Sequence, residues 1–62
     1  MPHITVGVPK RDVDTKRKLV AKLTDLVAET YGIRKEAISI VIEESSPENI
    51  GVGGVLLVDR QS

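Results

Sequence analysis

The chain has 62 residues and a mass of 6.7 kDa, so we expect one domain over residues 1–62 and no second one. Nine Lys and Arg residues balance nine Asp and Glu residues, so no net field draws the chain to nucleic acid or to an anionic membrane. The chain has no cysteine and one histidine, which excludes disulfides, thiolate metal sites and a histidine metal cluster. The beginning of the chain does not resemble a signal peptide, and the longest apolar run, Val55–Val58, is too short to span a bilayer. These features predict a cytoplasmic protein without a membrane partner.

A chain of this length has little material for a core. Burial of about 60% of the unfolded surface contributes roughly 85–90 kcal/mol, at ~25 cal/mol per Å² of apolar area. Ordering the chain costs about 93 kcal/mol at ~1.5 kcal/mol per residue, so the free energy of folding one isolated copy lies near zero. We therefore expect a homo-oligomer, in which other copies cover the surfaces that one subunit leaves open.

The first predicted element is a β-strand over residues 2–8, where apolar and other residues alternate. The apolar residues at every second position share one face: Ile4, Val6 and Val8. Pro2 has the same parity as this set, which places its ring at the start of the strand on the buried side. Pro9 ends the strand because proline has no N–H to donate to a neighbouring strand.

A long helix is predicted over residues 13–31. Its apolar residues recur at helical spacing and are expected to form one stripe: Leu19, Val20, Leu23, Leu26, Val27 and Tyr31. Asp12 is a suitable N-cap, and Asp14 in the first turn is favoured by the helix dipole. Gly32 after the last apolar residue predicts the end of the helix.

The second half of the chain predicts one more long strand and a small ribbon. Residues 33–37 are a connection with room for one helical turn, and the run Ile38–Ile42 is a second strand. Residues 44–49 are a loop, Gly51–Gly54 is a turn, and Val55–Val58 is a short apolar strand or ribbon. The predicted fold class is therefore α/β (α+β): a β-α-β subunit with parallel strands, one long crossover helix and a short C-terminal β-ribbon.

Few residues of this chain can carry chemistry. The single histidine, His3, is expected on the surface of the first strand, and the glycines Gly51–Gly54 fit a turn better than a nucleotide-binding loop. Pro2 becomes a secondary amine at the chain start when Met1 is removed. Burial on an apolar face near a cation lowers the pKa of such an amine, so it can act as a base near neutral pH. From residue type alone, a proline that merely begins a strand is the commoner case.

Four features together resemble the 4-oxalocrotonate tautomerase family over nearly the whole chain. They are Pro2 at the start of a strand, Arg11 before a long helix, the second strand Ile38–Ile42 and the Gly51–Gly54 turn. The resemblance implies a β-α-β subunit that assembles as a hexamer, a trimer of dimers. It also implies cofactor-independent keto–enol tautomerisation, with the amino-terminal proline as general base and with no metal.

Carried over residue by residue, the resemblance makes Pro2 the general base and Arg11 the group that binds a substrate carboxylate and stabilises the developing enolate. The segment between them is one residue shorter than usual, so Lys10 competes with Arg11 for this role. Ser39 stands where most members of the family have a second arginine that a neighbouring subunit donates to the site, and Ile50 where they have an aromatic residue in the pocket wall. Ser39 can still donate a neutral hydrogen bond, but the loss of charge makes a dicarboxylate such as 2-hydroxymuconate a doubtful substrate.

The sequence therefore predicts an isomerase, a tautomerase of 2-hydroxydienoate or enol-pyruvate type acids, whose partners are a small carboxylate substrate and further copies of the chain. One alternative keeps Pro2 but changes the reaction to hydration or dehalogenation. Another alternative is an oligomeric binding protein that has lost catalysis together with the second arginine.

Overall fold

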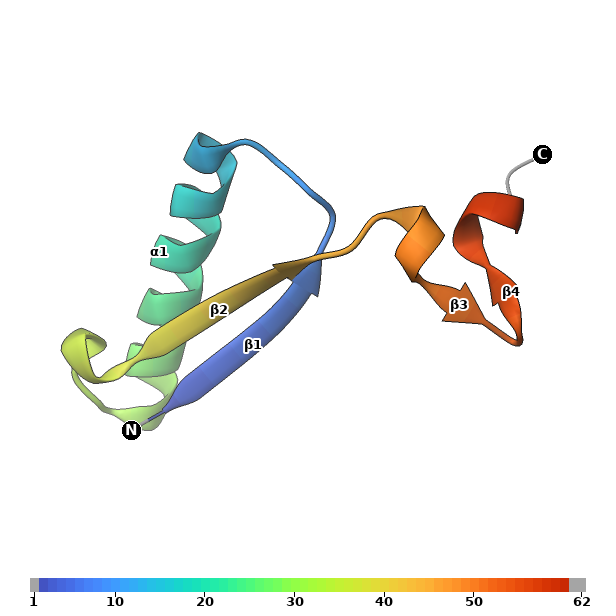
Figure 1. Cartoon of the computed structure of the whole chain (residues 1–62). Coiled ribbons are helices and arrows are strands. Elements are labelled where there is room, and N and C mark those ends of the chain that lie inside the picture. The colour runs from blue at the N-terminus through green and yellow to red at the C-terminus, as the bar shows by residue number, and fades with distance from the viewer. Residues whose placement is uncertain (1, 61–62) are drawn as a thin grey trace.

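The computed structural model describes residues 2–60, and it contains the predicted β-α-β unit (Figure 1). Strand β1 (His3–Val8) is followed by helix α1 (Val13–Tyr31) and strand β2 (Ser39–Glu44). The two strands are parallel, and His3 pairs with Ser39 at one end of the sheet. The predicted strands and helix are thus confirmed, although β2 begins one residue later than expected and continues to Glu44.

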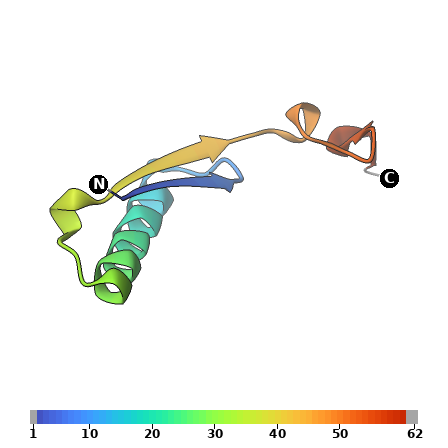
Figure 2. The same ribbon diagram turned by 90° about the horizontal axis from the view of Figure 1, so that it is seen from below.

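The sheet has one covered face and one open face. In β1 the apolar set with Ile4 is half-buried, and the intervening residues, His3, Thr5 and Gly7, are exposed. The same alternation occurs in β2, where Ile40 and Ile42 are half-buried. Figure 2 shows that α1 lies on one side of the two strands only. The side chains therefore alternate between a covered face and an open face, as predicted, because one helix covers only one face of a sheet.

Helix α1 begins and ends where its capping residues predict. The carboxylate of Asp12 accepts hydrogen bonds from the Thr15 N–H at 3.3 Å and the Thr15 hydroxyl at 2.6 Å. These bonds lower the pKa of Asp12 below its ordinary value because they stabilise the carboxylate. At the other end Gly32 adopts a φ of 64°, and its N–H bonds to the Ala28 carbonyl. This left-handed conformation suits glycine and stops the helix.

The apolar stripe predicted on α1 divides into two parts. Leu19, Leu23 and Val27 are half-buried, whereas Leu26 and Tyr31 are 61% and 75% exposed. Part of the predicted stripe therefore stays exposed in a single chain, because two strands spaced about 4.8 Å apart are too narrow to cover the whole apolar arc of a helix. Within residues 2–60, no helix combines the length and the apolar character that crossing a bilayer requires.

A small antiparallel ribbon follows β2. Strand β3 (Gly51–Val52) pairs with strand β4 (Val55–Leu56), and Gly53 and Gly54 form the turn with φ values of 61° and 84°. Figures 1 and 2 show this ribbon extending away from the β-α-β unit. The predicted turn is thus shorter than Gly51–Gly54: Gly51 and Val52 form strand β3, and only Gly53 and Gly54 turn the chain, in the conformations that a tight hairpin requires.

Short 3-10 turns replace part of what the sequence predicted as loop and ribbon. One turn, Lys35–Ala37, falls within the predicted connection. A second, Pro47–Asn49, lies inside the predicted loop. The third, Leu57–Arg60, corrects the predicted ribbon, which ends at Leu56 instead of Val58. Strands β3 and β4 pair over only two residues each, so no further pairing extends β4 and the chain forms a turn instead.

A single copy of the chain is more extended and more exposed than a compact folded monomer of the same size. Its exposed surface is 5031 Å², against about 3,900 Å² for a folded monomer of this mass. Its radius of gyration is 15.1 Å, against about 10.6 Å for a compact chain of this length. No residue between 2 and 60 is fully buried, and large apolar side chains are exposed on α1, on every strand except β1 and on the last 3-10 turn: Val13, Val20, Leu26, Tyr31, Val41, Val52, Val55, Leu56 and Val58. This surface requires other protein to cover it.

Candidate active site

Pro2 lies in an apolar hollow at the start of β1. The hollow has a volume of about 360 Å³ and is lined by Pro2, His3, Ile4, Val27 and Tyr31, so β1 and the end of α1 form its walls. The Pro2 carbonyl accepts a hydrogen bond from the Ser39 N–H at 3.2 Å, which fixes Pro2 beside β2. Met1, whose removal the prediction requires, lies outside the described residues. The predicted base therefore occupies a hollow with few polar groups.

A hydrogen-bonded group of three side chains occupies the open face of the sheet beside Pro2. The His3 Nδ1 atom lies 3.1 Å from the Ser39 Oγ, and the His3 Nε2 atom lies 3.2 Å from the Thr5 Oγ1. The backbones of Pro2 and Ser39 are adjacent in the sheet, but the Ser39 side chain is not among those that line the Pro2 hollow. His3 is exposed on the strand surface, as the sequence predicted. The alternation that put His3 and Thr5 on one face was the available signal, since residues two apart on a strand are neighbours.

Arg11 and Lys10 lie at the opposite end of β1 from Pro2. The six residues of β1 separate them from Pro2 by about 20 Å, at ~3.3 Å per residue. The Arg11 guanidinium donates from Nη1 to the Lys10 carbonyl at 2.7 Å. Ile50 lies at this end as well, in a smaller hollow of about 200 Å³ that it shares with Val8. One chain therefore does not bring Arg11 or Ile50 to Pro2, and a site with all of them needs more than one chain.

Glu44 ties the Arg11 segment to the rest of the fold. Its Oε2 atom lies 2.7 Å from the Lys16 Nζ and accepts the Arg11 backbone N–H at 3.1 Å. The ammonium of Lys16 is the main cause that lowers the pKa of Glu44, and the Arg11 N–H adds to it. Glu44 is the last residue of β2 and Lys16 is the fourth residue of α1, so a contact between them depends on the packing of the two elements.

We expect Glu44→Gln to lower the melting temperature near neutral pH and to remove part of its dependence on acid. The folded-state pKa of Glu44 is depressed, so its contribution is present above the usual value of 4.5 and is lost as pH falls through the lower folded value. The difference in melting temperature between wild type and variant should be widest above about pH 6 and should narrow as pH falls below 4.5 and through the lower folded pKa of Glu44. Thermal melts across this range, with Glu29→Gln as the matched control, measure it. A difference that is constant with pH would contradict the assigned role.

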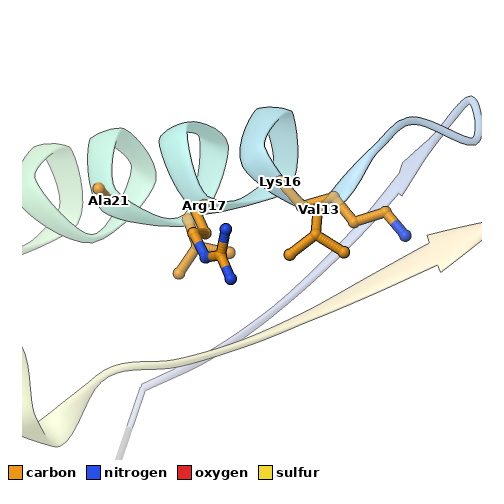
Figure 3. A pocket seen from close by; sticks show the side chains of 5 residues that line it. Val13, Lys16, Arg17 and Ala21 are labelled. Carbon is orange, nitrogen blue, oxygen red and sulfur yellow. The ribbon is translucent and has the colours of Figure 1, made fainter.

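A further hollow of about 380 Å³ lies on the first half of α1, away from Pro2, Ser39 and Ile50 (Figure 3). It is lined by Val13, Lys16, Arg17, Val20 and Ala21, none of which is a predicted site residue. Its two cations bind carboxylates elsewhere, Lys16 that of Glu44 and Arg17 that of Asp14. The aliphatic parts of Lys16 and Arg17 and the two valines line this part of the helix surface. Such a surface is suited to packing against other protein.

The parallel β-α-β unit, its C-terminal ribbon and the leading proline define a tautomerase-type subunit. The family model described as "Tautomerase enzyme" matches residues 2–60, and the chain belongs to this family. It is 39% identical over 62 residues to the 2-hydroxymuconate tautomerase of Bacillus subtilis, covering 98% of this chain and 100% of the relative.

Solved structures give the same result. The chain resembles DmpI from Archaeoglobus fulgidus with a TM-score of 0.84 and 48% identity, over 94% of this chain and 100% of the other. It resembles YwhB, a homologue of 4-oxalocrotonate tautomerase, with a TM-score of 0.85 and 39% identity, over 94% and 97% of the two chains. The predicted membership of the 4-oxalocrotonate tautomerase family is thus confirmed, and the chain is an isomerase with tautomerase activity.

Proposed function

We propose that this chain catalyses cofactor-independent keto–enol tautomerisation of 2-hydroxydienoate or enol-pyruvate type acids in the cytoplasm, with Pro2 as general base after removal of Met1. The main support is the place of Pro2 in a hollow of about 360 Å³ with apolar walls, in a chain of the tautomerase family. Apolar walls disfavour the charged form of an amine, which keeps the secondary amine available to take a proton.

The proposed reaction moves one proton and needs no other reactant. The neutral amine of Pro2 takes the hydroxyl proton of the enol, and electron density shifts from oxygen toward the conjugated carbon. The resulting ammonium returns the proton to that carbon, which leaves the ketone and the free amine. Hydrogen-bond donors placed around the enolate oxygen stabilise the intermediate charge.

Arg11 is proposed to bind the substrate carboxylate. A guanidinium grips a carboxylate through two parallel hydrogen bonds, and it presents five N–H donors, of which one is bonded here to the Lys10 carbonyl. Lys10 is the competing cation in the same segment and would act only as a point charge. Since about 20 Å of strand separates Arg11 from Pro2, the Arg11 that serves a given Pro2 comes from another copy.

The proposed assembly is a homohexamer, a trimer of dimers. The exposed apolar side chains of α1, β2 and the ribbon support an assembly of several copies, because a single chain buries no residue between 2 and 60. Because Pro2 and Arg11 lie far apart in one chain, the proposed active site also requires the assembly. Its mass can be measured by analytical ultracentrifugation.

The proposed substrate carries one carboxylate, and an ultraviolet ketonisation assay tests this. Ser39 replaces a second cation with a neutral hydroxyl, so we expect turnover of phenylenolpyruvate and at least about tenfold lower kcat/KM for the dicarboxylate 2-hydroxymuconate. Ser39→Arg should narrow this difference by about tenfold, because it restores a charge-assisted hydrogen bond. The protein must first be shown by intact mass to lack Met1. If neither acid is turned over by that protein, the proposed function is wrong.

A further inference from the structure

A polar hollow lies at the Arg11 end of the chain, beside the cations that the proposed function uses. It has a volume of about 280 Å³ and is lined by Lys10, Glu44, Ser45, Ser46 and Asn49. Ser45 also lines the smaller hollow that contains Val8 and Ile50, so the two hollows adjoin. An apolar wall and a polar hollow therefore lie side by side, and the proposed function assigns no role to the uncharged side chains of the polar one.

The charges around the polar hollow favour an anion. Its one acidic group, the Glu44 carboxylate, lies 2.7 Å from the Lys16 ammonium and accepts the Arg11 backbone N–H at 3.1 Å. Lys10 forms no ion pair with any residue between 2 and 60. The Arg11 guanidinium bonds to the Lys10 carbonyl at 2.7 Å, which places a second cation beside the hollow. Since its carboxylate is already paired, the hollow presents an excess of positive charge.

Asn49 and Ser46 supply hydrogen-bond donors to the same hollow. The side-chain NH2 of Asn49 donates to the Ser46 Oγ at 3.3 Å, and the Asn49 backbone N–H donates to the Ser46 carbonyl at 2.8 Å. A carboxamide NH2 has two hydrogens, so one remains for a ligand. Because the Ser46 oxygen accepts from Asn49, the hydroxyl hydrogen of Ser46 is left to donate as well.

We propose that this hollow is the subsite for the substrate carboxylate and that Asn49 is a specificity-determining residue within it. The cations of the 10–11 segment supply the charge, while Asn49 and Ser46 donate to carboxylate oxygens. The adjoining hollow at Ile50 takes the hydrocarbon part of the same acid. This inference rests on the proposed function, because it takes the Arg11 end of one copy as the part of the shared site that receives the carboxylate.

The side-chain amide of Asn49 can be observed directly by nuclear magnetic resonance. Asn49 is the only asparagine of the chain and Gln61 the only glutamine, so a ¹H–¹⁵N spectrum contains two side-chain NH2 pairs. Asn49→Asp removes one pair and thereby assigns it. Titration of the oligomer with 3-phenylpropionate, which has the carbon skeleton of phenylenolpyruvate, should shift the Asn49 pair until it saturates. The neutral 3-phenylpropionamide should not.

Two outcomes of this titration would overturn the inference. One is an Asn49 pair that stays in place while backbone signals elsewhere shift and saturate, since the carboxylate would then bind at another position. The other is an equal shift with the neutral amide, since the hollow would then not recognise charge.

Two variants and a matched control measure the contribution of Asn49 to turnover of phenylenolpyruvate. Asn49→Leu loses one neutral hydrogen bond, so KM should rise about fivefold while kcat stays within about twofold. Asn49→Asp places a like charge against the substrate carboxylate, so KM should rise by about tenfold or more. Glu48→Gln, on the same 3-10 turn but outside the hollow, should leave KM within about twofold. A wild-type KM in Asn49→Asp would contradict the proposed subsite.

Melting temperature and oligomer mass separate binding from a structural role of the bond between Asn49 and Ser46. If Asn49 only stabilises the 3-10 turn, both variants will have a lower melting temperature, and the KM of the folded oligomer will be unchanged. That result would also overturn the inference.

Pro2→Ala, titrated in the same way, distinguishes failure of this inference from failure of the proposed function. It should lose turnover and keep the saturable shift of the Asn49 pair, because Pro2 is not part of the carboxylate subsite. Full turnover with that shift would remove the role of Pro2 and keep the subsite. Loss of turnover without any shift of the Asn49 pair would remove the subsite and keep the role of Pro2.

Discussion

Pro2→Ala is expected to lower kcat/KM for phenylenolpyruvate by about 10²-fold or more, the contribution of a well-placed general base. Alanine leaves an amine at the same position after Met1 is removed, but a primary amine without the ring is more mobile. The ring of Pro2 is fixed at the start of β1, where its carbonyl accepts the Ser39 N–H at 3.2 Å. The variant therefore keeps the strand pairing and loses the orientation and basicity of the reacting nitrogen. Initial rates by ultraviolet absorbance measure the effect.

The Pro2→Ala experiment requires that the assembly is unchanged. Analytical ultracentrifugation of Pro2→Ala should give the wild-type mass, because Pro2 has no backbone N–H to lose and the smaller alanine side chain fits in the same space. A matched preparation that retains Met1 should also be inactive, since the nitrogen of Pro2 is then an amide without useful basicity. Wild-type activity in the preparation that retains Met1 would show that the nitrogen of Pro2 is not the base, and wild-type activity in Pro2→Ala would show that the proline ring is not required.

At low substrate concentration, mixed oligomers of Pro2→Ala and Arg11→Ala chains are expected to be more active than either variant alone. One chain cannot place its own Arg11 near its own Pro2, because β1 holds them about 20 Å apart. A site that uses both must therefore join Pro2 of one copy to Arg11 of another. Random co-assembly of equal amounts leaves about a quarter of the sites with both residues intact. Co-expression with two tags and tandem purification provides the mixed protein.

Each variant purified alone is the control for the mixing experiment, and Arg11→Ala alone should raise KM for the carboxylate by about 10–100-fold, the effect of a charge-assisted pair. Lys10→Ala, prepared in the same way, tests the competing cation. If the mixture is no more active than the average of its two components, Pro2 and Arg11 do not meet in a shared site. If Lys10→Ala complements Pro2→Ala while Arg11→Ala alone has the wild-type KM, the carboxylate binds Lys10.

Local pattern was sufficient for the long elements of the fold. Apolar residues recur at every second position in β1 and at helical spacing in α1. These two patterns predict which side chains face the covered side of each element, and both depend only on consecutive residues. Asp12 and Gly32 fixed the ends of α1 because caps act on the backbone groups within one turn. The ribbon was shorter than predicted since the apolar run Val55–Val58 contains no signal that stops a strand at Leu56.

The sequence predicted which residues belong to the candidate site but not how they are arranged in space. Pro2 and Arg11 were predicted as site residues from a resemblance to a family in sequence. The order of residues in a sequence does not give the distance between them in the fold. The contact of His3 with Ser39 depends on the register of two strands whose partners are 36 positions apart. The contact of Glu44 with Lys16 depends on how the end of β2 meets the second turn of α1. Neither contact follows from any stretch of neighbouring residues.

The sequence by itself therefore determined the strands, the helix, its ends and the family, because these follow from periodicity, caps and the order of a few residues. The tertiary structure alone decided that Pro2 and Arg11 lie at opposite ends of β1, and that His3 and Glu44 contact Ser39 and Lys16. The physical reason is that strand pairing and helix packing join residues distant in the chain, while the rigid rise of a strand separates residues that lie close together along it.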